Sequence, residues 1–365
     1  MKKTLLILAL LTILAAAIPA QKIEKPKLTA VPPTDAQRVL IDEGIDFHDR
    51  KRYEEAIRKY EQVLRENPDC AIALYELALS LYNKPDKAKA DEVARKGAQY
   101  KSKHLAQFYA LIGAVLDDSG KSDEAIALYK IATKIVKDDK DLSYQMGDVS
   151  YNFGVTYFRL KRYAEARDVL KEGISADFAH PGASFLLAEI FTGTKYKIPG
   201  LMAAARYLGL DQKNPARVKR AAAIILERLK KPEEDEKTGN INIFLDMVAP
   251  KDEGDFGMYE LLISMTGIST DEDKKANKTE NQMFIESIST LISMLSEDKK
   301  LRSTFVGKTY IPYLDAMRKA GYHETLGYLV LQIAGNSDAS KWTAANPKKV
   351  LEFYEWSRAY QLPAK

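Results

Sequence analysis

The four histidines come first, because histidine is a common zinc ligand and a frequent general base. His48, His104, His180 and His323 lie far apart, and no two have the i, i+4 spacing or the neighbouring acid of a zinc-binding helix. Cys70 is the one cysteine, so it has no CxxC partner and forms no internal disulfide. We therefore predict no metal site and no catalytic residue, and we assign Cys70 a structural role.

Other catalytic motifs are also absent from the sequence. It contains no glycine-rich phosphate loop, no GxSxG turn and no dinucleotide fingerprint. Its 55 lysine and arginine residues are nearly balanced by 51 aspartate and glutamate residues. This balance, without a long basic block, argues against a dedicated nucleic-acid-binding protein. No cofactor is predicted, and an enzyme would need a site that only folding assembles.

The elements that would position any site are indicated by a repeat of small side chains. Glycine or alanine recurs at intervals of 34, 35, 41 and 34 residues, and a second small residue follows each by twelve. Small side chains at such positions let two helix backbones approach closely where they cross. The pattern predicts five helix-turn-helix repeats. Their small residues are Gly44, Ala78, Gly113, Gly154 and Ala188 in the first helix and Ala56, Ala90, Ala125, Ala166 and Gly200 in the second.

Further positions resemble a known repeat family. Leu40, Gly44, Phe47, Ala56, Tyr60 and Pro68 have the spacing of the tetratricopeptide (TPR) repeat. The resemblance covers residues 37–214, although the family's tryptophan near the start of the first helix is absent. The fifth repeat also resembles exported TPR proteins of Gram-negative bacteria. The resemblance implies an all-α solenoid that binds a protein or peptide partner and has no enzymatic activity.

The resemblance also implies which side chains face the concave groove of the solenoid. Five of them are aromatic, and aromatic side chains provide a large contact area at a low entropic cost. The alternative is that these rings pack against neighbouring helices, including C-terminal helices folded into the groove. The predicted groove residues are Tyr75, Tyr82, Asn83, Gln107, Asp117, Asp118, Tyr151, Phe158, Arg159, Phe185 and Glu189.

The N-terminus predicts export. Lys2 and Lys3 precede an apolar run that ends at Ile18, and small residues follow up to Ala20. Residues 1–20 are thus expected to be a cleaved signal peptide, so that the mature protein is periplasmic or secreted and makes no stable membrane insertion. An uncleaved anchor is the alternative. Residues 21–34 contain three prolines and are predicted to form an extended tether.

The repeats are expected to be followed by a second, smaller domain. Residues 135–145 interleave charged and apolar residues, which predicts a lengthened second helix in repeat three. The predicted solenoid, with a trailing helix over 216–231, spans 35–231. An acidic linker and an extended segment follow over 232–255, with the domain boundary at 231–240 and a strand or extended cover at 241–247. The C-terminal helical domain spans 256–365, with helices over 277–296 and 322–334 and a last helix that begins at Pro347.

Two functions from different classes fit these predictions. The first is a non-enzymatic interaction scaffold of the cell envelope, which binds a partner segment in the aromatic groove. The second is a module that binds a glycan or another carbohydrate: aromatic rings would stack on sugars while Asp117, Asp118 and Glu189 accept hydroxyl protons. An envelope hydrolase is a third and weaker interpretation.

Overall fold

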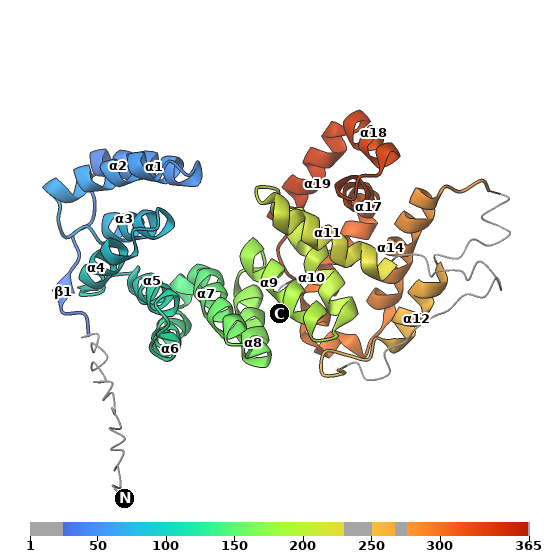
Figure 1. Ribbon diagram of the computed structural model, residues 1–365, viewed down its shortest axis with the longest axis horizontal. Coiled ribbons are helices and arrows are strands. Elements are labelled where there is room, and N and C mark those ends of the chain that lie inside the picture. The colour runs from blue at the N-terminus through green and yellow to red at the C-terminus, as the bar shows by residue number, and fades with distance from the viewer. Residues whose placement is uncertain (1–24, 230–249, 267–275, 364–365) are drawn as a thin grey trace, which may run out of the picture.

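The computed structural model describes residues 25–229, 250–266 and 276–363, and nearly all of their regular structure is helical. Helices pair within each repeat, and successive pairs stack into a curved array (Figure 1). The predicted all-α solenoid is therefore confirmed. The first helices are α1 (Asp35–Asp49), α3 (Ala71–Asn83), α5 (Leu105–Asp118), α7 (Met146–Arg159) and α9 (Pro181–Gly193). The second helices are α2 (Tyr53–Glu66), α4 (Lys87–Gly97), α6 (Ser122–Asp138), α8 (Tyr163–Ala176) and α10 (Lys197–Leu210).

The small residues mark the helix crossings, and all ten are buried. In the first helices, glycine occurs where the opposing side chain of the second helix is large. A Cβ atom built on Gly44 would lie 2.4 Å from the Tyr60 ring, and one on Gly113 would lie 3.0 Å from the Tyr129 ring. Sixteen residues separate the two members of each such pair. Where the second helix has alanine at this position, the first helix also has alanine, as in Ala78 with Ala94 and Ala188 with Ala204.

The insertion in repeat three corrects part of the prediction. The second helix α6 is lengthened, but it ends at Asp138. A separate 3₁₀ helix, η1, spans Lys140–Gln145 and leads into α7. The two helices are separated at Asp139, which has an extended backbone. Its side chain caps η1 by accepting a hydrogen bond from the amide of Asp141.

The N-terminal segment, predicted to be an extended tether over 21–34, is described from residue 25 and is attached to the repeats there. Leu28–Thr29 form strand β1, which pairs in parallel with β2 (Tyr100–Lys101). The amide of Val31 also donates to the Asp69 carbonyl oxygen at 3.0 Å. Residues 25–33, called the strap below, therefore lie along the first repeats. The predicted signal peptide at 1–20 lies outside the described residues.

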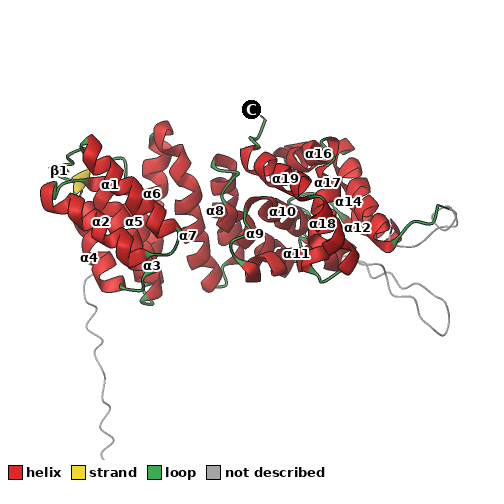
Figure 2. Cartoon of the chain, turned by 90° about the horizontal axis from the view of Figure 1, so that it is seen from above, coloured by secondary structure: helices red, strands yellow, loops and turns green. Residues whose placement is uncertain are grey.

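The C-terminal helices pack on the last repeat instead of standing apart from it (Figures 1 and 2). Together with α10 and α11 they share one apolar core. The predicted boundary at 231–240 and the extended segment at 241–247 lie outside the described residues. The helices here are α11 (Pro215–Leu229), α12 (Gly257–Thr266), α14 (Glu280–Glu297), α15 (Phe305–Lys308), α16 (Tyr310–Lys319), α17 (Tyr322–Ile333), α18 (Ser337–Ala345) and α19 (Pro347–Ala359), with a 3₁₀ turn, η2, at Leu301–Ser303.

A buried arginine holds this junction together. Arg206 of α10 is fully buried, and its guanidinium lies between the rings of Phe178 and Tyr313, at 4.3 and 4.6 Å from their centroids. Its Nη1 donates to the carbonyl oxygen of Ser357 in α19 at 2.6 Å. The helix that carries it, α10, is buried at every residue from Ile198 to Leu210. In the part of the chain that the structure describes, no helix is both long and apolar enough to cross a membrane.

Candidate functional site

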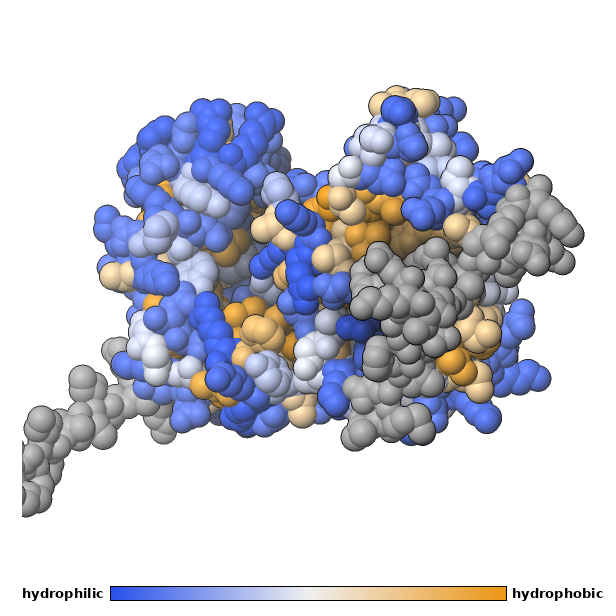
Figure 3. All heavy atoms as spheres, turned by 45° about the vertical axis from the view of Figure 1, so that its right-hand side comes forward, coloured by the Kyte–Doolittle hydropathy of each residue, from blue (hydrophilic) through white to orange (hydrophobic). Residues whose placement is uncertain are grey.

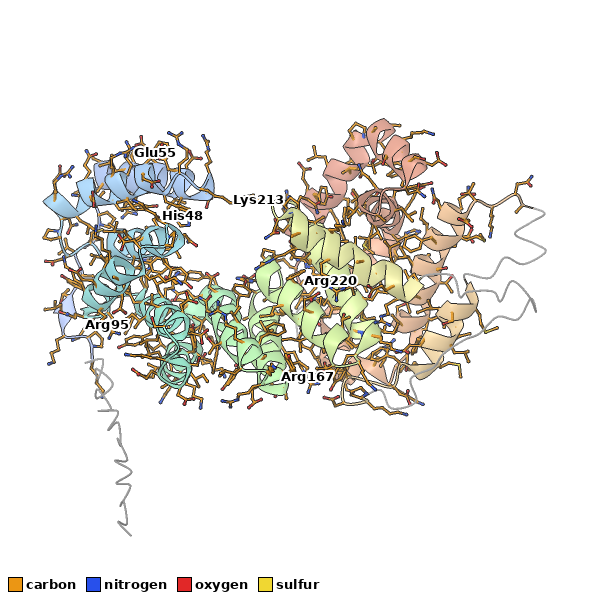
Figure 4. All side chains as sticks on the ribbon, viewed as in Figure 1. His48, Glu55, Arg95, Arg167, Lys213 and Arg220 are labelled. Carbon is orange, nitrogen blue, oxygen red and sulfur yellow. The ribbon has the colours of Figure 1, made fainter. Side chains whose placement is uncertain are left out.

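The candidate site is the inner face of the array, which the first helix of each repeat forms. Helices α1, α3, α5, α7 and α9 contact one another in sequence, and α11 continues the row beside α9. The surface is hollowed between the first repeats and the C-terminal helices (Figure 3). His48 of α1 and Lys213, just before α11, lie on opposite sides of this hollow (Figure 4). We call this hollow the groove.

All five predicted aromatic residues lie on this face and are half-buried. Each of them also contacts other side chains of the protein. Tyr75 stacks on His104 with ring centroids 5.8 Å apart, and Phe158 meets Tyr163 edge to face at 5.5 Å. Phe185 packs on Tyr207 at 5.1 Å. The rings are therefore held in place while part of each remains open to solvent. Their exposure is intermediate between that of a core residue and that of a free binding anchor.

Polar residues at the C-terminal ends of the first helices form a row across three repeats. The Tyr82 hydroxyl donates to Asp118 Oδ2 at 2.8 Å, and Lys87 Nζ lies 2.8 Å from the same oxygen. Arg159 Nη1 donates to Asp118 Oδ1 at 2.7 Å and to Asp117 Oδ2 at 2.8 Å. Burial opposes ionisation of Asp118, but hydrogen bonds from Lys87, Arg159 and Tyr82 outweigh it and lower its pKa. We call Tyr82, Asp118, Asp117 and Arg159 the polar row.

Glu76 of α3 carries a carboxyl group with an unusual pKa. Burial, followed by repulsion from Asp49 of α1 and Asp148 of α7, raises its pKa to about 7. Glu76 therefore titrates near neutrality, and a cation placed beside it would favour the charged form. Three carboxylates from three repeats thus make the middle of the groove acidic.

At the far end of the groove, α11 reaches back over the predicted residues. Arg217 donates from Nη2 to the Tyr151 hydroxyl at 3.0 Å, and its guanidinium lies 5.2 Å from the Phe185 ring centroid. Arg220 Nε donates to Glu189 Oε1 at 2.8 Å. The groove is therefore closed at this end by basic residues, whereas its middle is acidic.

The other predicted residues lie near the two rims. Asn83 Nδ2 lies 3.4 Å from His48 Nε2, and Gln107 Oε1 lies 2.8 Å from His104 Nδ1. His48, Glu76, His104, Arg217 and Arg220 were not among the predicted residues. His48 stands at the same repeat position as Asp117, so applying the pattern to repeat one would have found it. The two arginines follow the last repeat, where the period gives no signal.

The histidine, cysteine and acidic side chains of the described residues bear on whether the protein could catalyse a reaction. No group of three or more His, Cys, Asp or Glu side chains in the described ranges is placed to hold a metal ion. His48 Nδ1 lies 2.7 Å from Ser80 Oγ, as in a nucleophile–base pair, but Ser80 is fully buried and has no access to substrate. Burial also raises the pKa of Cys70, so its thiol is less ready to act as a nucleophile.

Comparisons with known proteins agree with the repeat architecture. Residues 41–100 and 110–184 match the family model of the tetratricopeptide repeat. No curated protein sequence matches the chain.

Several solved structures have a similar fold. A thermophilic TPR protein of Thermus thermophilus is 19% identical over 52% of this chain and 99% of its own, with a TM-score of 0.45. PilF of Pseudomonas aeruginosa is 19% identical over 53% of this chain and 86% of its own, with a TM-score of 0.43. MamA of Desulfovibrio magneticus is 15% identical over 53% and 98%, with a TM-score of 0.34.

Proposed function

We propose that this array of tetratricopeptide repeats is a non-enzymatic interaction scaffold whose concave groove binds a segment of a partner protein. The observation that carries the proposal is the set of half-buried aromatic side chains on the first helices of repeats two, four and five, from Tyr75 to Phe185. Aromatic residues that are fixed in place but still open are the usual anchors of peptide recognition, since they lose little entropy on binding.

The charges in the groove indicate the kind of segment. Asp49 and Asp148, from two other repeats, act electrostatically on Glu76, whose pKa is raised to about 7. A lysine or arginine side chain of the partner would relieve their mutual repulsion. We therefore expect a segment in which basic residues alternate with large apolar ones, bound in an extended form along the helices.

The carbohydrate alternative is less well supported by these contacts. Asp117, Asp118 and Glu189 would have to accept hydroxyl protons from the sugar. Arg159 already engages both aspartates, and Arg220 engages Glu189. A sugar would have to displace these charge-assisted hydrogen bonds, which are among the stronger ones in proteins.

The location of this activity is part of the proposal. The pattern of residues 1–20 supports export, so the partner would be a protein of the bacterial periplasm or of the outside of the cell. Measuring the intact mass of the protein purified from the envelope fraction checks this step. A chain that still starts at Met1 and needs detergent for extraction would contradict export with release.

The groove is tested by a double substitution and a matched control. Replacing Phe158 and Phe185 by alanine should weaken partner binding by about 2–4 kcal/mol with the fold kept, because anchors carry most of an interface's energy. The control is Ile131→Ala, which removes a residue that is 47% exposed on α6. The partner is first captured from the envelope by photo-crosslinking from Asn83, and affinities are then measured by calorimetry. Equal binding by both variants, with circular dichroism unchanged, would reject the groove as the binding surface.

A further inference from the structure

A second surface lies at the strap, at the N-terminal end of the array. The strap crosses the N-terminal ends of α3 and α5 and encloses a pocket of about 300 Å³ with them. This volume is at the lower end of the range for small-ligand sites and suits one large side chain. The lining residues are Ala30, Val31, Pro32, Pro33, Arg38, Ala71, Ile72, Ser102, Lys103 and His104.

The wall of the pocket is mostly apolar. Six of the lining residues, four from the strap and two from the start of α3, are apolar. Leu28 and Val31 are also 45% and 46% exposed, although they are large apolar residues. Apolar surface that remains open beside a pocket is typical of an interaction site.

The surrounding charge is basic. Lys25, Lys101 and Lys103 are exposed, and none of them forms an ion pair with any residue in the described ranges. Two acids also lie nearby: Asp69 Oδ1 accepts the Tyr100 hydroxyl at 2.6 Å, and Asp35 Oδ1 lies 3.8 Å from Arg38 Nε. The pocket lining itself holds Arg38 and Lys103 and no acidic residue, so its charge is positive, the opposite of the acidic surroundings of Glu76.

We infer that the strap pocket docks an acidic protein segment. A large apolar side chain of the segment fills the pocket between Val31 and Ile72. Carboxylates on either side of it pair with Lys101 and Lys103. Charge complementarity selects this occupant, because a basic segment of the kind proposed for the groove would be repelled here. The surface is thus separate from the groove and selects the opposite charge.

The test uses a fluorescent peptide that alternates glutamate with leucine, and a control peptide that alternates lysine with leucine. Anisotropy titration of the full chain should show binding of the acidic peptide only, and binding should weaken as salt is added. The double variant Lys101→Glu/Lys103→Glu should raise the Kd at least about tenfold. Val31→Ser, which removes apolar surface without changing charge, should also raise it. Lys130→Glu, at an exposed lysine of α6, is the matched control and should leave Kd unchanged.

Several results would overturn the inference. Equal binding of the two peptides, or the same loss for Lys130→Glu as for the double variant, would show that net charge alone is responsible. Binding of the protein to phosphatidylglycerol vesicles that needs Lys101 and Lys103, without peptide binding, would assign the surface to membranes. Phe158→Ala tests the groove alone, so retention of acidic-peptide binding in that variant separates this inference from the proposed function.

Discussion

At the scale of single residues, Glu76 is the most informative side chain in the groove. Burial and two neighbouring carboxylates raise its pKa from 4.5 to about 7. The folded protein therefore binds this proton more tightly than the unfolded chain does. The contribution of Glu76 to stability is complete below pH 4.5 and is lost as the pH rises through about 7.

The variant Glu76→Gln should remove this dependence on pH. At about pH 8 it should be more stable than the parent by roughly 1–3 kcal/mol, because glutamine avoids the buried charge. Below about pH 5, where Glu76 is protonated, the two proteins should unfold at nearly the same urea concentration. Urea unfolding followed by circular dichroism at both pH values checks this. Glu61→Gln, at an exposed glutamate of α2, is the control, and a difference that is the same at both pH values would contradict the prediction.

At the scale of elements, a pairing of side-chain sizes controls how the two helices of a repeat cross. Gly44 faces Tyr60 and Gly113 faces Tyr129, whereas an alanine in the first helix is matched by an alanine in the second. The spacing of small residues was readable from the sequence because each pair lies within one repeat. The size compensation sixteen residues later is equally readable from the sequence.

A single methyl group should reveal this pairing. Gly44→Ala places a Cβ atom 2.4 Å from the Tyr60 ring, so either the ring or the helix must move, at a cost of about 1–3 kcal/mol. Gly193 also lies in a first helix, but a Cβ atom there meets nothing within 4 Å. Gly193→Ala should therefore be neutral or stabilise by up to about 1 kcal/mol through helix propensity. Thermal unfolding midpoints compare the two, and equal shifts would mean that the crossing is not the cause.

At the scale of the whole molecule, the arrangement of the helices depends on contacts between residues that lie far apart in the sequence. Arg206 and Ser357 are bonded although 151 positions separate them, and Arg217 reaches Tyr151 across 66. The β1–β2 pairing likewise joins segments about two repeats apart. Helical periodicity reports which face of a helix is apolar but not which distant helix covers it. For this reason the solenoid was predictable from the sequence, whereas the strap and the basic closure of the groove were not.

The link between the array and the C-terminal helices can be broken at Gly209 of α10. A Cβ atom there would lie 2.1 Å from Ser357 Oγ and 2.7 Å from the Tyr313 hydroxyl. Gly209→Ala should push α19 outward, at a cost of about 1–3 kcal/mol, and expose Trp356, which stacks on Tyr313. A red shift of tryptophan emission in a Trp342→Phe background reports this movement. Unchanged emission would show that α19 does not depend on this contact.

The polar row has a mechanical consequence for the array. It joins α3, α5 and α7 through charge-assisted bonds at their C-terminal ends. Packed helices can slide past one another by small shear movements, but charged partners must separate before the joined ends can move apart. When the ends of the array are pulled, the edge opposite the polar row should lengthen first. Because its two edges would lengthen by different amounts, the array should twist as it is stretched.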